Sequence, residues 1–208
     1  MRKRFAVVGD GRFMITLSVK RPFNTPDLYA NPRLMPILHR LLGADCVISS
    51  FGSVVAFAGA DAQSVHFDYP PLFESEEVCA ALPPHAITLV VPLVDLDEST
   101  GTTALWEGSH SRVGARDQLQ KIAAESSFDG ATMPYAAAGD VYLMDFRLIH
   151  GGTANNSDHE RPILYIVYSR PWFREDMNFD EQPAIKITNK QYKMVPKPHR
   201  HLFTQAQF

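Results

Sequence analysis

Two short segments of the chain carry residue types that bind a transition metal. Ser64 to Tyr69 reads SVHFDY, which places His66 and Asp68 two residues apart, and His150 follows far downstream. An extended strand points residues two apart to the same face, so His66 and Asp68 can converge on one ion. Two imidazoles and one carboxylate on one face of a metal leave the opposite positions open, as in Fe(II) oxygenases. For His66 alone, a half-buried histidine bonded to a neighbour is the ordinary alternative.

An arginine accompanies the downstream histidine. Arg161 stands eleven residues after His150 and opens a strongly β-forming run, so the fold can place it beside His150 on a neighbouring strand. Its planar guanidinium matches a carboxylate bidentately and stays charged at any working pH. The alternative role for Arg161 is a surface ion pair with Glu160 or Asp158.

A third segment completes a recognisable set. Ser99 to Arg112 reads STGTTALWEGSHSR, which is a turn, a short strand and a Gly-Ser turn. Together the three segments, in this order, resemble the phytanoyl-CoA dioxygenase family of Fe(II)/2-oxoglutarate oxygenases. Members of that family have a His-x-Asp pair, a later Gly-Ser-His turn, a distal His and an Arg eleven residues beyond it. The resemblance runs from about Asp45 to Phe173.

The resemblance implies a fold and a metal centre. The fold is mainly β with minor helices (α+β), a double-stranded β-helix (jelly roll, cupin-like). His66, Asp68 and His150 are then the catalytic ligands of Fe(II). Arg161 anchors the distal carboxylate of the co-substrate 2-oxoglutarate, and O2 is the second co-substrate.

Further co-substrate contacts follow from the same resemblance. In family members of similar pattern, a Gln before the first His and a Thr before the Gly-Ser-His turn help to hold 2-oxoglutarate, and here these are Gln63 and Thr103. The alternatives are a hydrogen-bonded strand residue for Gln63 and an ordinary β-branched strand position for Thr103. The chain departs from several relatives at Gly152, where they carry a small hydroxyl residue. Thr153 is the neighbour that can replace it.

The implied reaction is hydroxylation of an unactivated C–H bond in a small organic, metabolite-like or natural-product-like substrate, with release of succinate and CO2. The retained Asp68 favours hydroxylation or another hydrogen-abstraction outcome, because halogenating relatives replace this carboxylate. The main alternative is a metal-binding jelly roll (cupin-like) that is not an oxygenase, since such ligands alone do not select iron. A Ser or Cys hydrolase using Cys79, or Ser109 with His110, lacks the Gly-x-Ser-x-Gly turn.

Several aromatic and basic residues near these motifs are candidates for a substrate pocket or for the core. The aromatic candidates are Tyr69, Phe73, Trp106 and Phe146. Arg112 and Arg147 are candidates for an acidic substrate group, with ion pairs as the alternative.

The elements that position these residues are short strands between Pro- and Gly-rich turns. The expected strands are Arg12–Val19, Cys46–Ser50, Val54–Phe57, Ser64–Tyr69, Ala86–Leu93, Thr103–Trp106, Asp140–Asp145 and Pro162–Ser169.

Two helices are expected. One begins with Asn31 as cap and Pro32 in the first turn and ends at Gly43, and a second covers Ala115–Glu125. The basic stretch Ile185–Phe208 is expected to be a solvated tail or edge segment.

Bulk properties limit the remaining possibilities. We expect residues 1–208 to form one domain, with a jelly-roll core at about 45–173 and a C-terminal extension at about 174–208. A net charge of −3, from 20 basic and 23 acidic residues, indicates neither nucleic acid nor a membrane as partner. Two cysteines and no signal peptide favour the cytoplasm. A small-molecule substrate is expected, whereas the oligomeric state cannot be inferred.

Overall fold

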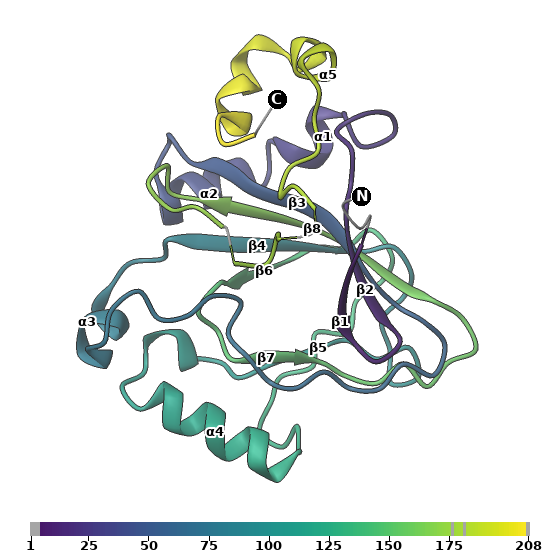
Figure 1. The fold of residues 1–208 in the computed structure, drawn as a ribbon, viewed down its shortest axis with the longest axis vertical. Coiled ribbons are helices and arrows are strands. Elements are labelled where there is room, and N and C mark those ends of the chain that lie inside the picture. The colour runs from purple at the N-terminus through teal and green to yellow at the C-terminus, as the bar shows by residue number, and fades with distance from the viewer. Residues whose placement is uncertain (1–4, 176, 181, 207–208) are drawn as a thin grey trace.

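The fold is built from two antiparallel sheets that face each other (Figure 1). The computed structural model describes residues 5–206 apart from 176 and 181. The large sheet has the order β1-β2-β3-β8-β4-β6, and the small sheet pairs β5 with β7. The strands are β1 (Ala6–Gly9), β2 (Arg12–Thr16), β3 (Val47–Ala56), β4 (Ala86–Pro92), β5 (Thr103–Leu105), β6 (Tyr142–Asp145), β7 (His150–Gly152) and β8 (Arg161–Ser169).

Helices cover the outer faces of both sheets. They are α1 (Pro26–Tyr29), α2 (Met35–Leu42), α3 (Glu76–Ala81), α4 (Ala115–Glu125) and α5 (Asn189–Met194), with 3-10 turns η1 (Ser109–Ser111) and η2 (Lys197–Phe203). Figure 1 shows α1, α2 and α5 on the outer side of the large sheet and α4 beyond the small sheet. Two facing antiparallel sheets with minor outer helices are the double-stranded β-helix that the sequence predicted. None of the helices in the described residues is long and apolar enough to cross a bilayer.

Strand alternation separates the core from an internal cavity. Along β8 the side chains of Ile163, Tyr165 and Val167 line the cavity, whereas those of Leu164 and Ile166 pack into the main core. Successive side chains of a strand point to opposite faces, so one strand supplies both surfaces. The large sheet therefore rests its outer face on the helices and presents its inner face to the small sheet.

The strands expected at Ala86–Leu93, Thr103–Trp106, Asp140–Asp145 and Pro162–Ser169 are confirmed to within two residues. The division into Cys46–Ser50 and Val54–Phe57 is wrong, because β3 is continuous. Gly52, which lies between the two expected strands, faces Tyr165 in the sheet register. A Cβ there would lie 2.5 Å from the Ile15 carbonyl oxygen and closer still to the Tyr165 hydroxyl. Gly52 thus permits a close approach rather than a turn.

The segment Ser64–Tyr69 is not a regular strand, contrary to expectation. His66 and His150 exchange two backbone hydrogen bonds of 2.8 and 3.0 Å as an isolated bridge. Gln63 N–H donates to the Gly152 carbonyl at 2.8 Å. The segment therefore runs beside β7 without a full ladder.

The N-terminal part of the chain extends the large sheet further than expected. β1 was not predicted, and with β2 it precedes the expected jelly-roll core at about 45–173 although both strands belong to the large sheet. The strand predicted for Arg12–Val19 ends at Thr16, and Ser18 makes only a bridge to Lys186. β7 was also missed, because three residues with two glycines carry little strand signal.

The first predicted helix begins later than expected. Asn31 Oδ1 accepts a hydrogen bond of 2.9 Å from Arg33 N–H, and the helix itself starts at Met35. Its end is as predicted, because Gly43 has a φ of 101°, a conformation that favours glycine. The helix predicted for Ala115–Glu125 is confirmed as α4.

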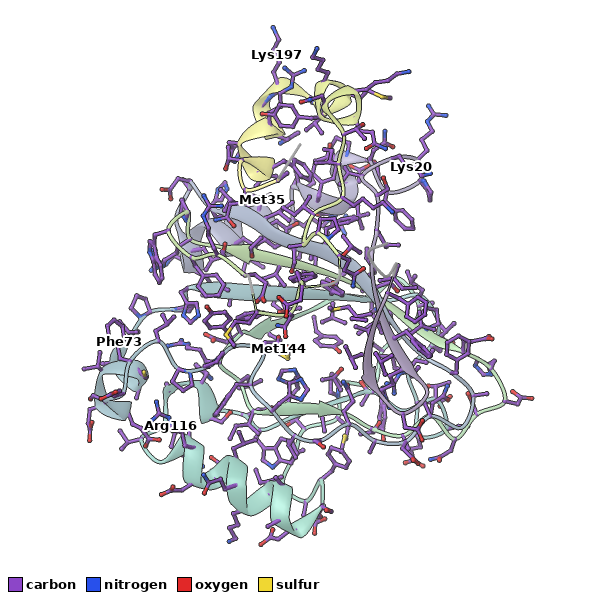
Figure 2. The ribbon with its side chains drawn as sticks, viewed as in Figure 1. Lys20, Met35, Phe73, Arg116, Met144 and Lys197 are labelled. Carbon is purple, nitrogen blue, oxygen red and sulfur yellow. The ribbon has the colours of Figure 1, made fainter. Side chains whose placement is uncertain are left out.

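The C-terminal stretch is not a solvated tail. Its apolar residues Ile185, Ile187, Val195, Leu202 and Phe203 are buried in the main core. Its lysines remain exposed, and Lys197 points away from the molecule (Figure 2). The predicted tail was inferred from charge alone, whereas the apolar residues between the lysines attach it to the large sheet.

Candidate functional site

Two histidines and one aspartate meet inside the double-stranded β-helix. His66 and Asp68 come from the extended segment beside β7, and His150 begins β7. One ligand atom from each of the three side chains lies within 4.8 Å of the others. The imidazole centroids of His66 and His150 are 4.4 Å apart, and His150 Nε2 lies 3.3 Å from Asp68 Oδ1. The cluster has the spacing needed to surround a single metal ion.

The backbone fixes the orientation of both imidazoles. His66 Nδ1 lies 2.8 Å from the Ser64 carbonyl oxygen, and His150 Nδ1 lies 2.9 Å from the Leu148 carbonyl oxygen. A carbonyl oxygen only accepts hydrogen bonds, so each Nδ1 carries its hydrogen. Each Nε2 is left with a free lone pair, and a backbone carbonyl that holds the other ring nitrogen is the usual support of a metal-binding histidine.

The electrostatics of the cluster favour a cation. Burial and the neighbouring His150 lower the pKa of His66. Burial acts to lower the pKa of His150, but the charge and hydrogen bond of Asp68 outweigh it and the pKa is raised. Burial acts to raise the pKa of Asp68, but His150 and His66 outweigh it and the pKa is lowered. The carboxylate thus stays ionised beside two imidazoles, an arrangement that favours a bound cation.

The Gly-Ser-His turn supports the cluster from behind. Ser109 Oγ donates to the Trp106 carbonyl at 2.7 Å and accepts from Ile149 N–H at 2.9 Å. Ile149 immediately precedes His150, so the serine fixes the start of β7. The sequence identified this turn only through family resemblance, and the structure gives its physical role.

Arg161 lies on the opposite sheet from His150, not on a neighbouring strand as expected. It begins β8, since the chain crosses from the small to the large sheet between Gly152 and Arg161. Its Nη1 donates to the carbonyl oxygens of Thr100 at 3.0 Å and Thr153 at 3.2 Å. The side chain lines the same cavity as the cluster, and the alternative role, an ion pair with Glu160 or Asp158, is not found among the described residues.

Gln63 and Thr103 also line this cavity. Gln63 Nε2 donates to the Val8 carbonyl at 2.9 Å, which leaves its second amide hydrogen available. Thr103 Oγ1 accepts from the Tyr142 hydroxyl at 3.1 Å, so its own hydrogen can be donated to a ligand. Both side chains are therefore able to contact a bound anion.

Sequence reasoning missed Arg12. This side chain is only 1% exposed and lines the cavity. Its Nε donates to the Asp61 carbonyl at 3.0 Å, and its Nη2 donates to the Thr153 carbonyl. A signal was present, because Arg12 shares the inward face of β2 with Met14 and Thr16. A charged side chain on the buried face of a strand costs desolvation free energy, which indicates that the residue has a function.

The cavity has a volume of about 370 Å³ and a polar and an apolar part. The apolar lining includes Met14, Val54, Phe146, Val167 and Phe179. Met144 points into the space between the two sheets in Figure 2 and also lines the cavity. The Tyr165 hydroxyl has no hydrogen-bond partner among the described residues. Such a mixture suits a small, largely apolar ligand with a few polar groups.

Of the four aromatic candidates, only Phe146 lines the main cavity. Trp106 is buried in the cluster between the small sheet and α4, and Tyr69 packs against Phe146 and Phe173. Phe73 is 52% exposed. Packing therefore explains Trp106 and Tyr69, and Phe73 is a surface residue.

The two basic candidates are engaged elsewhere. Arg147 forms an ion pair of 2.8 Å with Asp145 and donates to two backbone carbonyls. Arg112 donates to Gln118 Oε1 at 3.1 Å. Neither side chain lines the main cavity.

The hydrolase alternative finds no support in the described residues. Both hydrogen-bonding capacities of Ser109 are used to position β7. The Cys79 thiol donates to the Phe73 carbonyl at 3.3 Å. Neither residue has an activating base within hydrogen-bond distance, as a nucleophile requires.

Comparisons with known proteins agree with this geometry. The family model described as phytanoyl-CoA dioxygenase matches residues 9–163. Dioxygenase af480 of Aspergillus fumigatus is 26% identical over 155 residues, which are 74% of this chain and 47% of the relative. The chain thus spans about half the length of the curated relative that it matches.

Solved structures share the fold. HygX from Streptomyces hygroscopicus with nickel and 2-oxoglutarate bound has a TM-score of 0.63 at 14% identity, covering 88% of this chain and 82% of HygX. The complex of HygX that also contains hygromycin B has a TM-score of 0.61 at 14% identity, covering 85% and 79%. The non-heme monooxygenase ThoJ, as a nickel complex, has a TM-score of 0.54 at 17% identity, covering 86% and 75%. These likenesses confirm the predicted double-stranded β-helix.

Proposed function

Because the chain belongs to the phytanoyl-CoA dioxygenase family, we propose that it is an Fe(II)- and 2-oxoglutarate-dependent dioxygenase. The proposed reaction is hydroxylation of an unactivated C–H bond in a small organic substrate, with release of succinate and CO2. One observation carries the proposal: a single cavity holds a two-histidine, one-carboxylate cluster and two buried guanidinium groups.

The cluster fits Fe(II). His66 Nε2, His150 Nε2 and a carboxylate oxygen of Asp68 would hold the ion, because their backbone-fixed orientation leaves these atoms as donors. Two imidazoles and one carboxylate are the ligand set that leaves open positions for other molecules. Although burial acts to lower it, the pKa of His150 is raised by Asp68, which supports a cation at this place.

Arg161 fits the distal carboxylate of 2-oxoglutarate. Among the described residues its Nε and Nη2 have no acceptor, whereas its Nη1 is held by backbone carbonyls. The free edge of a rigid guanidinium can donate two parallel hydrogen bonds to a carboxylate. Thr103 and Gln63 retain one hydrogen each for the same ligand, as their bonds to Tyr142 and Val8 leave it free.

The apolar part of the cavity is the proposed substrate site. When bound, Fe(II), 2-oxoglutarate and O2 supply an oxidant able to remove hydrogen from an unactivated C–H bond. Phe146, Met14 and Val167 would hold the substrate and exclude water. HygX with hygromycin B bound supports a small-molecule substrate.

We also propose that the chain forms one oxygenase domain. The C-terminal segment packs its buried residues into the same core as α2, β3 and β8. It therefore belongs with the two sheets and does not form a second core.

The proposal is tested on anaerobically prepared, Fe(II)-loaded protein. Addition of 2-oxoglutarate should produce the weak visible charge-transfer band of a keto acid chelated to iron. Asp68→Ala and His150→Ala should bind iron poorly and give no band. A folded, iron-loaded wild-type protein without this band would overturn the assignment. If the band is present, succinate release can be used to screen candidate substrates.

A further inference from the structure

Two guanidinium groups lie together in the polar part of the cavity. Arg12 is 1% exposed and Arg161 is 6% exposed. Arg12 Nη2 and Arg161 Nη1 donate to the same acceptor, the carbonyl oxygen of Thr153. In the described part of the chain, neither forms an ion pair with a carboxylate. Asp61 acts on Arg12 from a distance beyond an ion pair, and two buried like charges without an ion-pair partner are costly unless a ligand supplies one.

Arg12 has one nitrogen to spare. Its Nε is held by the Asp61 carbonyl and its Nη2 by the Thr153 carbonyl. Within residues 5–206 apart from 176 and 181, Nη1 has no acceptor. The backbone thus fixes the guanidinium while one N–H group remains available to the cavity.

That free nitrogen lies where a side chain at position 152 would begin. A Cβ on Gly152 would be 2.8 Å from Arg12 Nη1 and 2.5 Å from Gln63 Oε1. Gly152 has no positive φ, and the space taken by Gln63 and Arg12 explains the glycine better than the backbone does.

We propose that Arg12 is a second co-substrate-binding residue, which holds the same distal carboxylate of 2-oxoglutarate as Arg161. This inference rests on the proposed function and assigns a role that the motif residues do not cover. It also predicts a site selective for dicarboxylates, because a keto acid without the distal carboxylate leaves two buried cations uncompensated.

The electrostatics of the site agree with this role. Burial and then the charge of Arg161 lower the pKa of Arg12 to about 10. Burial lowers the pKa of Arg161 to about 10 as well. Both groups remain charged at neutral pH, and an anion between them relieves their repulsion and their lost hydration.

The test compares two keto acids on anaerobic, Fe(II)-loaded protein by calorimetry. The probes are 2-oxoglutarate and 2-oxopentanoate, which has the same carbon chain without the distal carboxylate. Arg12→Gln should weaken 2-oxoglutarate binding by about tenfold or more, the value of one charged hydrogen bond. Binding of 2-oxopentanoate should not change. The matched control is Arg33→Gln, which removes an exposed arginine outside the cavity and should affect neither ligand.

A further variant separates binding from folding. Arg12→Lys keeps the charge and the aliphatic stem and should lose several-fold in 2-oxoglutarate affinity only, because a planar fork is replaced by a point charge.

Each other outcome has a defined meaning. An equal loss for both keto acids, or no loss for either, would overturn the role of Arg12 while the proposed function stands. Failure of the wild-type protein to bind 2-oxoglutarate would overturn both.

Discussion

Replacement of Arg161 by methionine separates an oxygenase from a jelly roll that only binds metal. Arg161 Nη1 bonds to backbone carbonyls, and Nε and Nη2 face the cavity without an acceptor among the described residues. Two charged hydrogen bonds to a carboxylate contribute about 3–6 kcal/mol at about 1.5–3 kcal/mol each. Arg161→Met should therefore weaken 2-oxoglutarate binding by about 10²- to 10⁴-fold, at about 1.4 kcal/mol for each factor of ten.

Arg161→Met should also lower the stability of the folded protein. The Thr102 carbonyl keeps a bond from Thr153 N–H, and the Thr153 carbonyl keeps its bond from Arg12. The Thr100 carbonyl loses its side-chain donor. One buried carbonyl left without a donor costs about 1–3 kcal/mol, so the variant should remain folded with a reduced melting temperature.

The assay is a pair of titrations, one with Fe(II) and one with 2-oxoglutarate, on wild type and variant. Arg147→Met is the matched control, because Arg147 is an equally engaged guanidinium outside the main cavity. It should lower stability without changing the affinity for 2-oxoglutarate. If Arg161→Met binds both Fe(II) and 2-oxoglutarate like the wild type, the oxygenase assignment is wrong and the metal-binding jelly roll replaces it.

Three further predictions concern the scaffold of the site. Ser109→Ala leaves Ile149 N–H without an acceptor and should cost about 1–3 kcal/mol in chemical denaturation; an unchanged stability would contradict the role of the turn. Gly52→Ala places a methyl group against the Tyr165 hydroxyl and should cost about 1–3 kcal/mol, measured in the same way. Burial lowers the pKa of His85 to about 4, so the unfolded chain takes up a proton near pH 6.5 that the folded protein binds only near pH 4. As the pH falls from about 6.5 to about 4, the free energy of unfolding should therefore decrease by up to about 3 kcal/mol. A His85→Phe variant whose melting temperature shows the same full decline with pH would refute this.

The sequence predicted the parts of the site that depend on local spacing. Two-residue spacing placed His66 and Asp68 on one side of an extended segment, and the motif order linked them to His150 and Arg161. The structure brings these residues to one cavity, although His66 lies in an isolated bridge and Arg161 lies on the opposite sheet. Local spacing and the family resemblance together therefore identified residues that share one cavity, even where the assigned element or the neighbouring strand was wrong.

The remaining features depend on contacts between distant parts of the chain. Gly52 lies between two strands that the sequence analysis separated, and only the facing Tyr165 and the Ile15 carbonyl explain a glycine there. Arg12 is one arginine among many until β2 places it against Gly152 and Thr153. Such pairings involve residues more than 100 positions apart, and periodicity contains no information about them.

The most direct test of the metal centre is anomalous diffraction at the iron edge from anaerobically grown crystals with Fe(II) and 2-oxoglutarate. We expect one iron peak bound by His66 Nε2, His150 Nε2 and Asp68, with the distal carboxylate of 2-oxoglutarate against Arg161. An iron peak elsewhere, or an ordered 2-oxoglutarate whose carboxylate does not contact Arg161, would contradict the proposed site.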